Sequence, residues 1–126
     1  MTALTTEART DLIAAVDNLG YRVYDVAPAV PAPPCIVVIP DQPWINVDRI
    51  GSNLSYECRW RLLVVVSPRK NSAAQIDAED AVDAVLGALS SPFLVTTVGS
   101  PQLTDTGAQG TVITTEISVS VRMKES

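Results

Sequence analysis

The chain has 126 residues and a formal net charge of −5 at pH 7, with 47% hydrophobic and 18% charged residues. This length predicts one domain, 1–126, with a sizeable core, and the composition is typical of a globular protein. The nine basic residues are scattered, which argues against direct recognition of nucleic acid, and no apolar run approaches the ~20 residues of a membrane span.

The first predicted element is an amphipathic helix over 6–19. A threonine can cap its start, and Gly20 ends it as a left-handed C-cap would. Its apolar stripe consists of Ala8, Leu12, Ala15, Val16 and Leu19. A short alternating strand is expected at 21–26. Four prolines within 28–34 then predict a stiff extended connector, because proline fixes φ and has no N–H to donate.

Two short strands are expected next. The apolar run 35–39 is typical of a strand buried on both faces or covered by a helix. The sequence at 41–43 indicates a turn, after which 44–47 adds another short strand. Gly51 and its small polar neighbours within 48–55 indicate a loop.

The residues over 56–66 alternate between two faces of a predicted strand. One face is apolar throughout, whereas the other begins with charged residues, including Arg59 and Arg61, and turns apolar halfway. This pattern predicts a strand that starts at an exposed end or an interface and finishes fully covered. We interpret Trp44, Trp60 and the three tyrosines as packing residues, with stacking on a base or ligand as the alternative.

A second amphipathic helix is predicted from Ser72, which makes a capping-box signature with Gln75. Its apolar stripe consists of Ala78, Val82, Val85, Leu86 and Leu89. Its other side carries Asp77, Glu79, Asp80 and Asp83. These carboxylates are interpreted as a solvated helix face. The alternatives are a divalent-metal or acid–base site, or an electrostatic contact with a basic patch on a neighbouring subunit, such as Arg59 or Arg61.

After this helix we expect a strand over 93–98 and a loop of about twelve residues over 99–110. Loops of that length in compact domains are usually functional or mobile. Within this loop, the segment 105–110, which includes Asp105 and Gln109, is expected either to bind a ligand or partner or to form a plain flexible hairpin.

The final strand, 111–123, alternates with almost no error, and its polar face carries Glu116 and Arg122. Neighbouring strands joined by short turns favour antiparallel pairing, and two amphipathic helices can cover one face of a sheet. The sequence therefore predicts an α+β fold with a mainly antiparallel sheet and two helices packed on one face.

The chain has no histidine, which removes the usual general base at neutral pH and histidine metal sites. Cys35 and Cys58 lie in apolar runs without a CxxC partner. They could pair only if their strands lie side by side, and buried free thiols are favoured because the N-terminus lacks a signal-peptide pattern. We therefore predict neither an enzyme nor a bound cofactor or metal.

The order of elements resembles the tail terminator proteins of long-tailed bacteriophages, also called tail completion or minor tail proteins. Four stretches carry the resemblance and together cover most of the chain: the helix end and short strand at 17–24, the apolar segment at 33–40, the strand at 60–66 followed by the helix from Ser72, and the closing alternating strand from Gly110.

This resemblance implies a small α+β subunit that forms a hexameric ring, caps the growing tail tube and presents a surface for the head connector. The implied partners are further copies of the chain, the tail tube protein and the head–tail connector protein. The implied location is the tail or neck of the virion, after assembly in the host cytoplasm. The family has no catalytic residues to transfer. The alternatives are a head-closure or head–tail adaptor protein, or a small-ligand binding module or enzyme that uses the acidic helix.

We expect Arg59, Arg61 and Glu116 to lie in or near subunit contacts, because charged residues on long strands need either water or partners. Charge reversal at Arg61 is accordingly expected to weaken assembly while leaving the monomer fold intact. The remaining candidate interface residues are Asp77, Asp80, Asp83, Asp105, Gln109 and Arg122.

Overall fold

The computed structural model describes residues 4–24, 34–47, 55–67, 71–89, 93–105 and 111–124. The elements in these ranges are α1 (Leu4–Val16), β1 (Arg22–Tyr24), β2 (Cys35–Val47), β3 (Ser55–Val66), α2 (Asn71–Ala88), β4 (Leu94–Val98), β5 (Gln102–Asp105) and β6 (Thr111–Lys124). The predicted α+β class is confirmed. No helix in the described part of the chain is both long and apolar enough to span a membrane.

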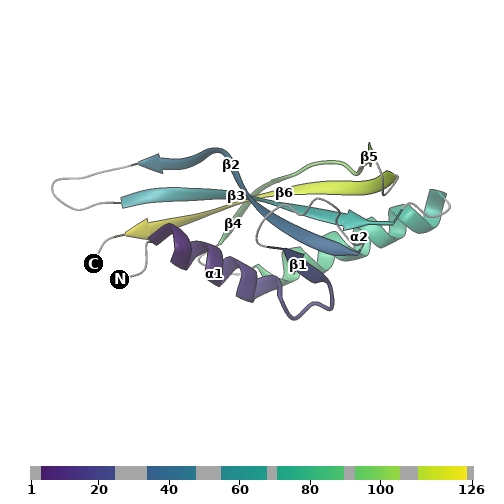
Figure 1. Ribbon diagram of the computed structural model, residues 1–126, viewed down its shortest axis with the longest axis horizontal. Coiled ribbons are helices and arrows are strands. Elements are labelled where there is room, and N and C mark those ends of the chain that lie inside the picture. Colours follow the sequence, from purple (N-terminus) through teal and green to yellow (C-terminus); the bar gives the residue numbers. More distant parts are fainter. Residues whose placement is uncertain are drawn as a thin grey trace.

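The strands form one sheet in the order β1-β2-β3-β6-β4, and β5 also pairs with β6. Only β1 and β2 run parallel among the described pairs, so the sheet is mainly antiparallel, as predicted. Figure 1 shows α1 and α2 on the same side of this sheet. The opposite side of the sheet is called the outer face below.

The centre of the fold is the long antiparallel pair of β3 and β6, in register from Ser55 opposite Lys124 to Val66 opposite Ile113. The predicted alternation of both strands is confirmed. Their helix-facing side contributes Tyr56, Cys58, Trp60, Leu62, Val64, Val66, Ile117, Val119 and Val121 to one buried cluster. Burying each large aliphatic side chain contributes about 1.5–3 kcal/mol, so this face supplies much of the stability.

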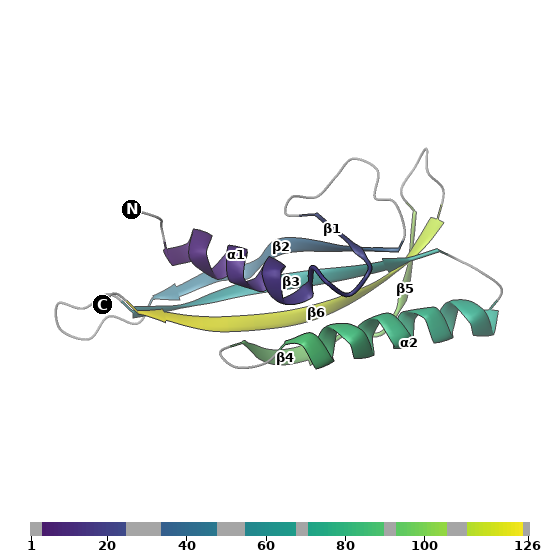
Figure 2. The same cartoon turned by 90° about the horizontal axis from the view of Figure 1, so that it is seen from below.

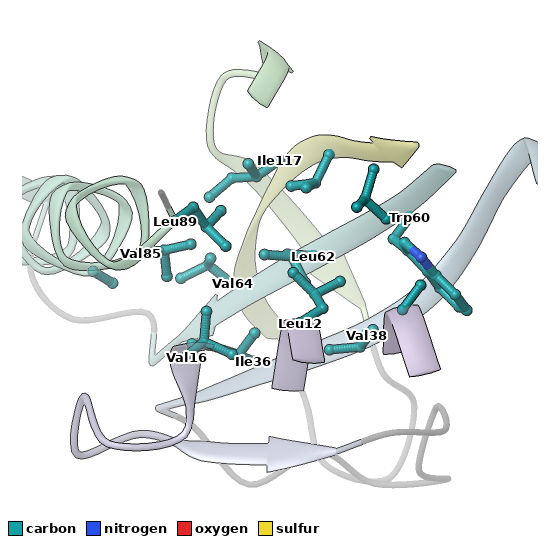
Figure 3. Close-up of a cluster of buried hydrophobic side chains, with 14 of the residues drawn as sticks. Leu12, Val16, Ile36, Val38, Trp60, Leu62, Val64, Val85, Leu89 and Ile117 are labelled. Carbon is teal, nitrogen blue, oxygen red and sulfur yellow. The ribbon is translucent and has the colours of Figure 1, made fainter. Parts of the chain in front are cut away.

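Both helices complete that cluster with their apolar stripes (Figure 3). Leu12 and Val16 of α1 and Val85 of α2 are fully buried, as their spacing predicted. α1 ends at Val16, three residues before the expected end, and the chain then turns to Gly20, whose φ of 88° is the left-handed conformation predicted for it. The side chain of the expected cap at Ser72 lies outside the described part.

The prediction of a turn at 41–43 between two short strands is wrong. β2 continues from Cys35 to Val47, and its register with β3 jumps from Pro40 opposite Trp60 to Ile45 opposite Cys58. Four residues of β2 therefore lie opposite the single residue Arg59. Such a bulge lets β2 pair with β3 on both sides of residues that cannot join the ladder. The turn-forming residues Asp-Gln-Pro at 41–43 therefore mark this bulge and not the end of a strand.

The predicted loop at 99–110 is also partly wrong, because β5 lies within it and pairs with the first residues of β6. The residues at 106–110 lie outside the described part, as do most residues of the predicted connectors after β1, β2, β3 and α2. Pro101 and the small polar residues around it favour a loop, so the sequence did not indicate the four-residue strand β5.

Cys35 and Cys58 are free and buried, as predicted. Their strands are neighbours, yet Cys35 lies opposite Val65, seven residues along β3 from Cys58, so roughly 23 Å of strand separates them. Burial raises the pKa of both thiols from 9.0 to about 11, and for Cys35 nearby Arg22 opposes that effect. Neither thiol has the lowered pKa of a reactive cysteine.

Candidate interaction surfaces

The outer face carries the two arginines that we expected at a subunit contact. Arg61 Nη1 lies 3.1 Å from Glu116 Oε1, and its Nε lies 3.6 Å from Asp41 Oδ1. Arg59 Nη2 lies 3.4 Å from the other oxygen, Asp41 Oδ2. Asp41 reaches both arginines because it belongs to the bulge that faces Arg59. Asp41 was not among the expected interface residues, because the turn-forming residues at 41–43 indicated a turn rather than a strand.

These contacts balance two positive against two negative charges within the chain. Asp41 is the most enclosed member, with 12% of its side chain exposed, whereas Glu116 is 53% exposed. Exposed ion pairs contribute about 0–1 kcal/mol each, so the value of this network lies chiefly in fixing the arginines over the sheet. The prediction that these residues contact another subunit stays a prediction. Within the subunit their charges are paired, but the buried Arg61 Nε makes no hydrogen bond among the described residues.

The two ends of the outer face differ in polarity. Near the start of β3, Asn46 Nδ2 donates to Glu57 Oε1 at 3.0 Å, and Arg122 Nη1 donates to Ser55 Oγ at 3.2 Å. At the other end, a small apolar cluster contains Cys35, Val37, Val65 and Val112, all buried. The prediction that β3 starts exposed on this face and finishes covered is confirmed.

The acidic residues of α2 do not converge on one site. Asp77 and Asp80 line a cavity of about 280 Å³, called the acidic pocket, together with Tyr21, Pro34, Val66 and Ser67. Asp83 instead lines a cavity of about 300 Å³. Three-residue spacing turns successive side chains by about 60° around a helix, which is enough to divide them between two flanks of α2. Within the described residues, no three Asp, Glu, Cys or His side chains are placed to hold a metal ion.

The cavity that Asp83 lines was not predicted from the sequence. We call it the edge pocket; α2 contributes Ala78, Val82 and Asp83, and the sheet contributes Val98, Pro101 and Thr115. Thr115 is 1% exposed, and its Oγ1 has no hydrogen-bond partner among the described residues. The available signal was a threonine between Ile113 and Ile117 on the mostly apolar face of β6.

The edge of the sheet formed by β4 and β5, called the β4–β5 edge, runs past this pocket. β4 and β5 lie one after the other along β6, on the side away from β3 (Figure 2). Three apolar side chains of this edge are exposed: Leu94 by 62%, Val98 by 41% and Leu103 by 73%. Asp105, one of the candidate interface residues, lies in β5, and Gln109 lies outside the described part.

The two tryptophans meet edge to face, with ring centroids 5.8 Å apart and ring planes at 72°. Trp60 is buried, which confirms its packing role, but Trp44 is 41% exposed. Trp60 Nε1 has no hydrogen-bond partner among the described residues. Both rings line a cavity of about 90 Å³ with Thr6 and Arg9. This volume holds little more than a few water molecules.

No protein-family model and no curated protein matches this sequence. Among solved structures, the chain is similar to a chain of the "Virion of native gene transfer agent (GTA) particle", with a TM-score of 0.54. The match covers 96% of this chain and 90% of the other, at 16% sequence identity. At this identity the match shows a shared fold, an α+β sheet with helices, over nearly the whole of both chains.

Proposed function

We propose that this chain is a structural virion protein that caps a tail tube as a ring, ends tail polymerisation and provides the surface for head–tail joining. The observation that carries the proposal is the end-to-end likeness in fold to a chain of a virion particle. The sequence resemblance to tail terminator proteins supplies the finer role. The proposal assigns the chain no catalytic activity, cofactor or metal.

The physical requirements of a ring are consistent with this fold. A closed ring needs two different surfaces on each subunit that meet around an axis. The described part offers several distinct surfaces: the charge-paired outer face, the acidic pocket beside Asp77 and Asp80, and the β4–β5 edge beside Asp83. The proposed contact residues remain those expected from the sequence, and Arg122 lies on the outer face near Ser55.

The proposed partners are further copies of the chain, the tail tube protein and the head–tail connector protein. The proposed location is the tail or neck of the virion, after assembly in the host cytoplasm. Inspection of the neighbouring reading frames is the cheapest supporting observation. A tail-tube gene next to this one would support the role in ending the tube.

The decisive experiment is light scattering coupled to size-exclusion chromatography, with negative-stain imaging, on the purified chain with and without tail tube protein. A sixfold ring, alone or on tube ends, supports the proposal. A monomer that never binds tube ends and whose melting temperature responds to a small ligand or a metal ion would overturn it in favour of a binding module.

A head-closure or head–tail adaptor protein is the second candidate. The likeness to a chain of a whole virion particle supports it as well as it supports a tube cap. The two roles differ in the first partner bound. A terminator associates with tail tubes in the absence of heads, whereas an adaptor associates with the head connector in the absence of tails, and sedimentation of each mixture separates them.

A further inference from the structure

The β4–β5 edge is interrupted opposite a polar residue. On the helix-facing side of β6, Val98 lies opposite Ile117 and Leu103 lies opposite Ile113. Thr115 lies between those two positions, facing the break at 99–101. A backbone hydrogen bond of 2.8 Å from Gly99 N to Glu116 O holds the break against β6. Because no edge residue is paired with Thr115, the sheet leaves a gap there, and this gap is the edge pocket.

The edge pocket combines an unmet hydrogen bond with apolar walls. Thr115 lines this pocket together with Ala78, Val82 and Val98. Its buried Oγ1 has no hydrogen-bond partner among the described residues. Burying a hydroxyl without a hydrogen bond costs free energy, so folding alone gives no reason for threonine here. Buried polar groups of this kind are typical of sites that are completed by a ligand or partner.

The mouth of the edge pocket is acidic and opens beside an unpaired strand edge. Glu79, Asp83 and Gln75 of α2 line it and are exposed. In the described part, neither β4 nor β5 has a second strand beside it. An exposed edge offers backbone N–H and C=O groups to an added strand, and the exposed Leu103 offers it apolar contact.

We propose that the β4–β5 edge binds an extended segment of a partner protein and that a lysine or arginine of this segment enters the edge pocket. The aliphatic stem of that side chain packs on Val82 and Val98. Its N–H groups donate to the exposed carboxylates of Glu79 and Asp83 and, once the entering side chain has displaced the atoms that cover it, to Thr115 Oγ1. The partner is basic because the pocket and the whole chain are acidic, whereas a second identical edge would bring like charges together. The inference rests on the proposed virion role, for which it names a docking surface.

Two synthetic octapeptides test the inference, one alternating valine and lysine and one alternating valine and glutamate. Each is titrated into the ¹⁵N-labelled full chain by NMR. The lysine peptide is expected to shift the amides of Val98, Gly99 and Leu103, and the glutamate peptide to leave them unchanged. Absence of a shift with the lysine peptide would overturn the proposal, as would equal shifts with both peptides or shifts centred on the acidic pocket.

Four variants sharpen this test. Thr115→Val removes the hydroxyl with little change in shape and is expected to weaken binding of the lysine peptide at least threefold while raising the melting temperature. Asp83→Asn is expected to weaken binding by a similar factor. The matched controls are Thr10→Val and Asp11→Asn, which make the same two changes at exposed positions of α1. Equal binding by all four variants overturns the proposal.

Light scattering on the same samples separates this inference from the proposed function. If rings form and cap tubes but the edge binds no peptide, the inference fails and the function stands. If the edge binds the lysine peptide but the chain never assembles with virion proteins, the function fails and the docking site stands. Self-association that the peptide does not displace, and that Leu103→Lys abolishes, shows that a second copy occupies the edge and overturns the choice of a basic partner.

Discussion

The outer face and the β4–β5 edge differ in how far their polar groups are paired within the chain. On the outer face, the charge of Arg61 is paired with Asp41 and Glu116, although its buried Nε makes no hydrogen bond among the described residues. At the edge, the buried hydroxyl of Thr115 has no partner among the described residues, and Leu103 beside it is 73% exposed. A surface with its charges already paired gains little from a partner, whereas one with unmet hydrogen bonds and exposed apolar area gains more. The sequence indicated the charged outer face as the contact surface. Binding of a partner is expected to release more free energy at the β4–β5 edge.

The largest expected effect contrasts the core with the edge. Leu62→Ala removes a fully buried side chain between the sheet and α1 (Figure 3) and is expected to cost about 2–5 kcal/mol of unfolding free energy. Leu103→Ala removes the same atoms from an exposed position and is expected to change stability by less than about 0.5 kcal/mol. Urea denaturation measures both. A loss of more than about 2 kcal/mol at Leu103 would mean that the edge is structural rather than available.

The next effect tests whether the outer face is satisfied internally. Arg61→Glu places a third carboxylate beside Asp41 and Glu116, and we expect a loss of about 1–3 kcal/mol in the isolated subunit. This revises the expectation that charge reversal at Arg61 affects assembly alone. The double variant Arg61→Glu/Glu116→Arg restores one pair and is expected to recover part of the loss. Urea denaturation of a monomeric sample measures it, and an unchanged midpoint for Arg61→Glu would show that the network contributes nothing.

The sequence predicted the fold wherever one pattern dominated. Six alternating positions of β3 and the matching positions of β6 predicted which side of each strand is buried, and the helical stripes predicted which side of α1 and α2 packs on the core. The errors came where turn-forming residues sit inside strands. Asp41 and its neighbours form a bulge, and Pro101 stands at a break beside β5. Local propensity favours turns at both places, and pairing with a long neighbouring strand overrides it.

The candidate surfaces were harder to predict because they depend on pairs that are distant in sequence. Nothing near Arg61 in the chain indicates that Asp41 and Glu116 lie beside it, since a bulge and a strand register decide both contacts. Asp77 and Asp83 look alike in sequence, yet they line different cavities on the two flanks of α2. Thr115 gave a signal, a polar residue on an apolar face, but its meaning depends on the break in the facing edge.

A smaller effect tests the unmet hydrogen bond itself. Replacing Thr115 by valine removes a buried hydroxyl that has no partner among the described residues and adds a methyl group of similar size. We expect a gain of about 1 kcal/mol in unfolding free energy, seen as a higher melting temperature by calorimetry. Thr97→Val, at an exposed position of the same edge, is the control and should change stability by less than about 0.5 kcal/mol. Destabilisation by Thr115→Val would show that the hydroxyl is already bonded.

The least disruptive test compares how tightly the two faces of the sheet are closed. Cys35 belongs to the apolar cluster of the outer face, and Cys58 belongs to the cluster beneath the helices. Both thiols have a pKa raised from 9.0 to about 11, which alone lowers the thiolate fraction near pH 8 by roughly a hundredfold. We therefore expect iodoacetamide to alkylate both slowly and at equal rates in the native protein, and rapidly in urea. Peptide mass spectrometry resolves the two sites.

The pH dependence of this reaction follows from the same shift. Because the folded thiols keep their protons above the pKa of the unfolded thiols, their contribution to stability is complete below about pH 9 and is lost as the pH rises towards about 11. Alkylation should accelerate over that window for both residues together, since unfolding exposes both. If Cys35 reacts much faster than Cys58 at pH 8, the apolar end of the outer face opens independently, and that face, like the edge, has contact area available for a partner.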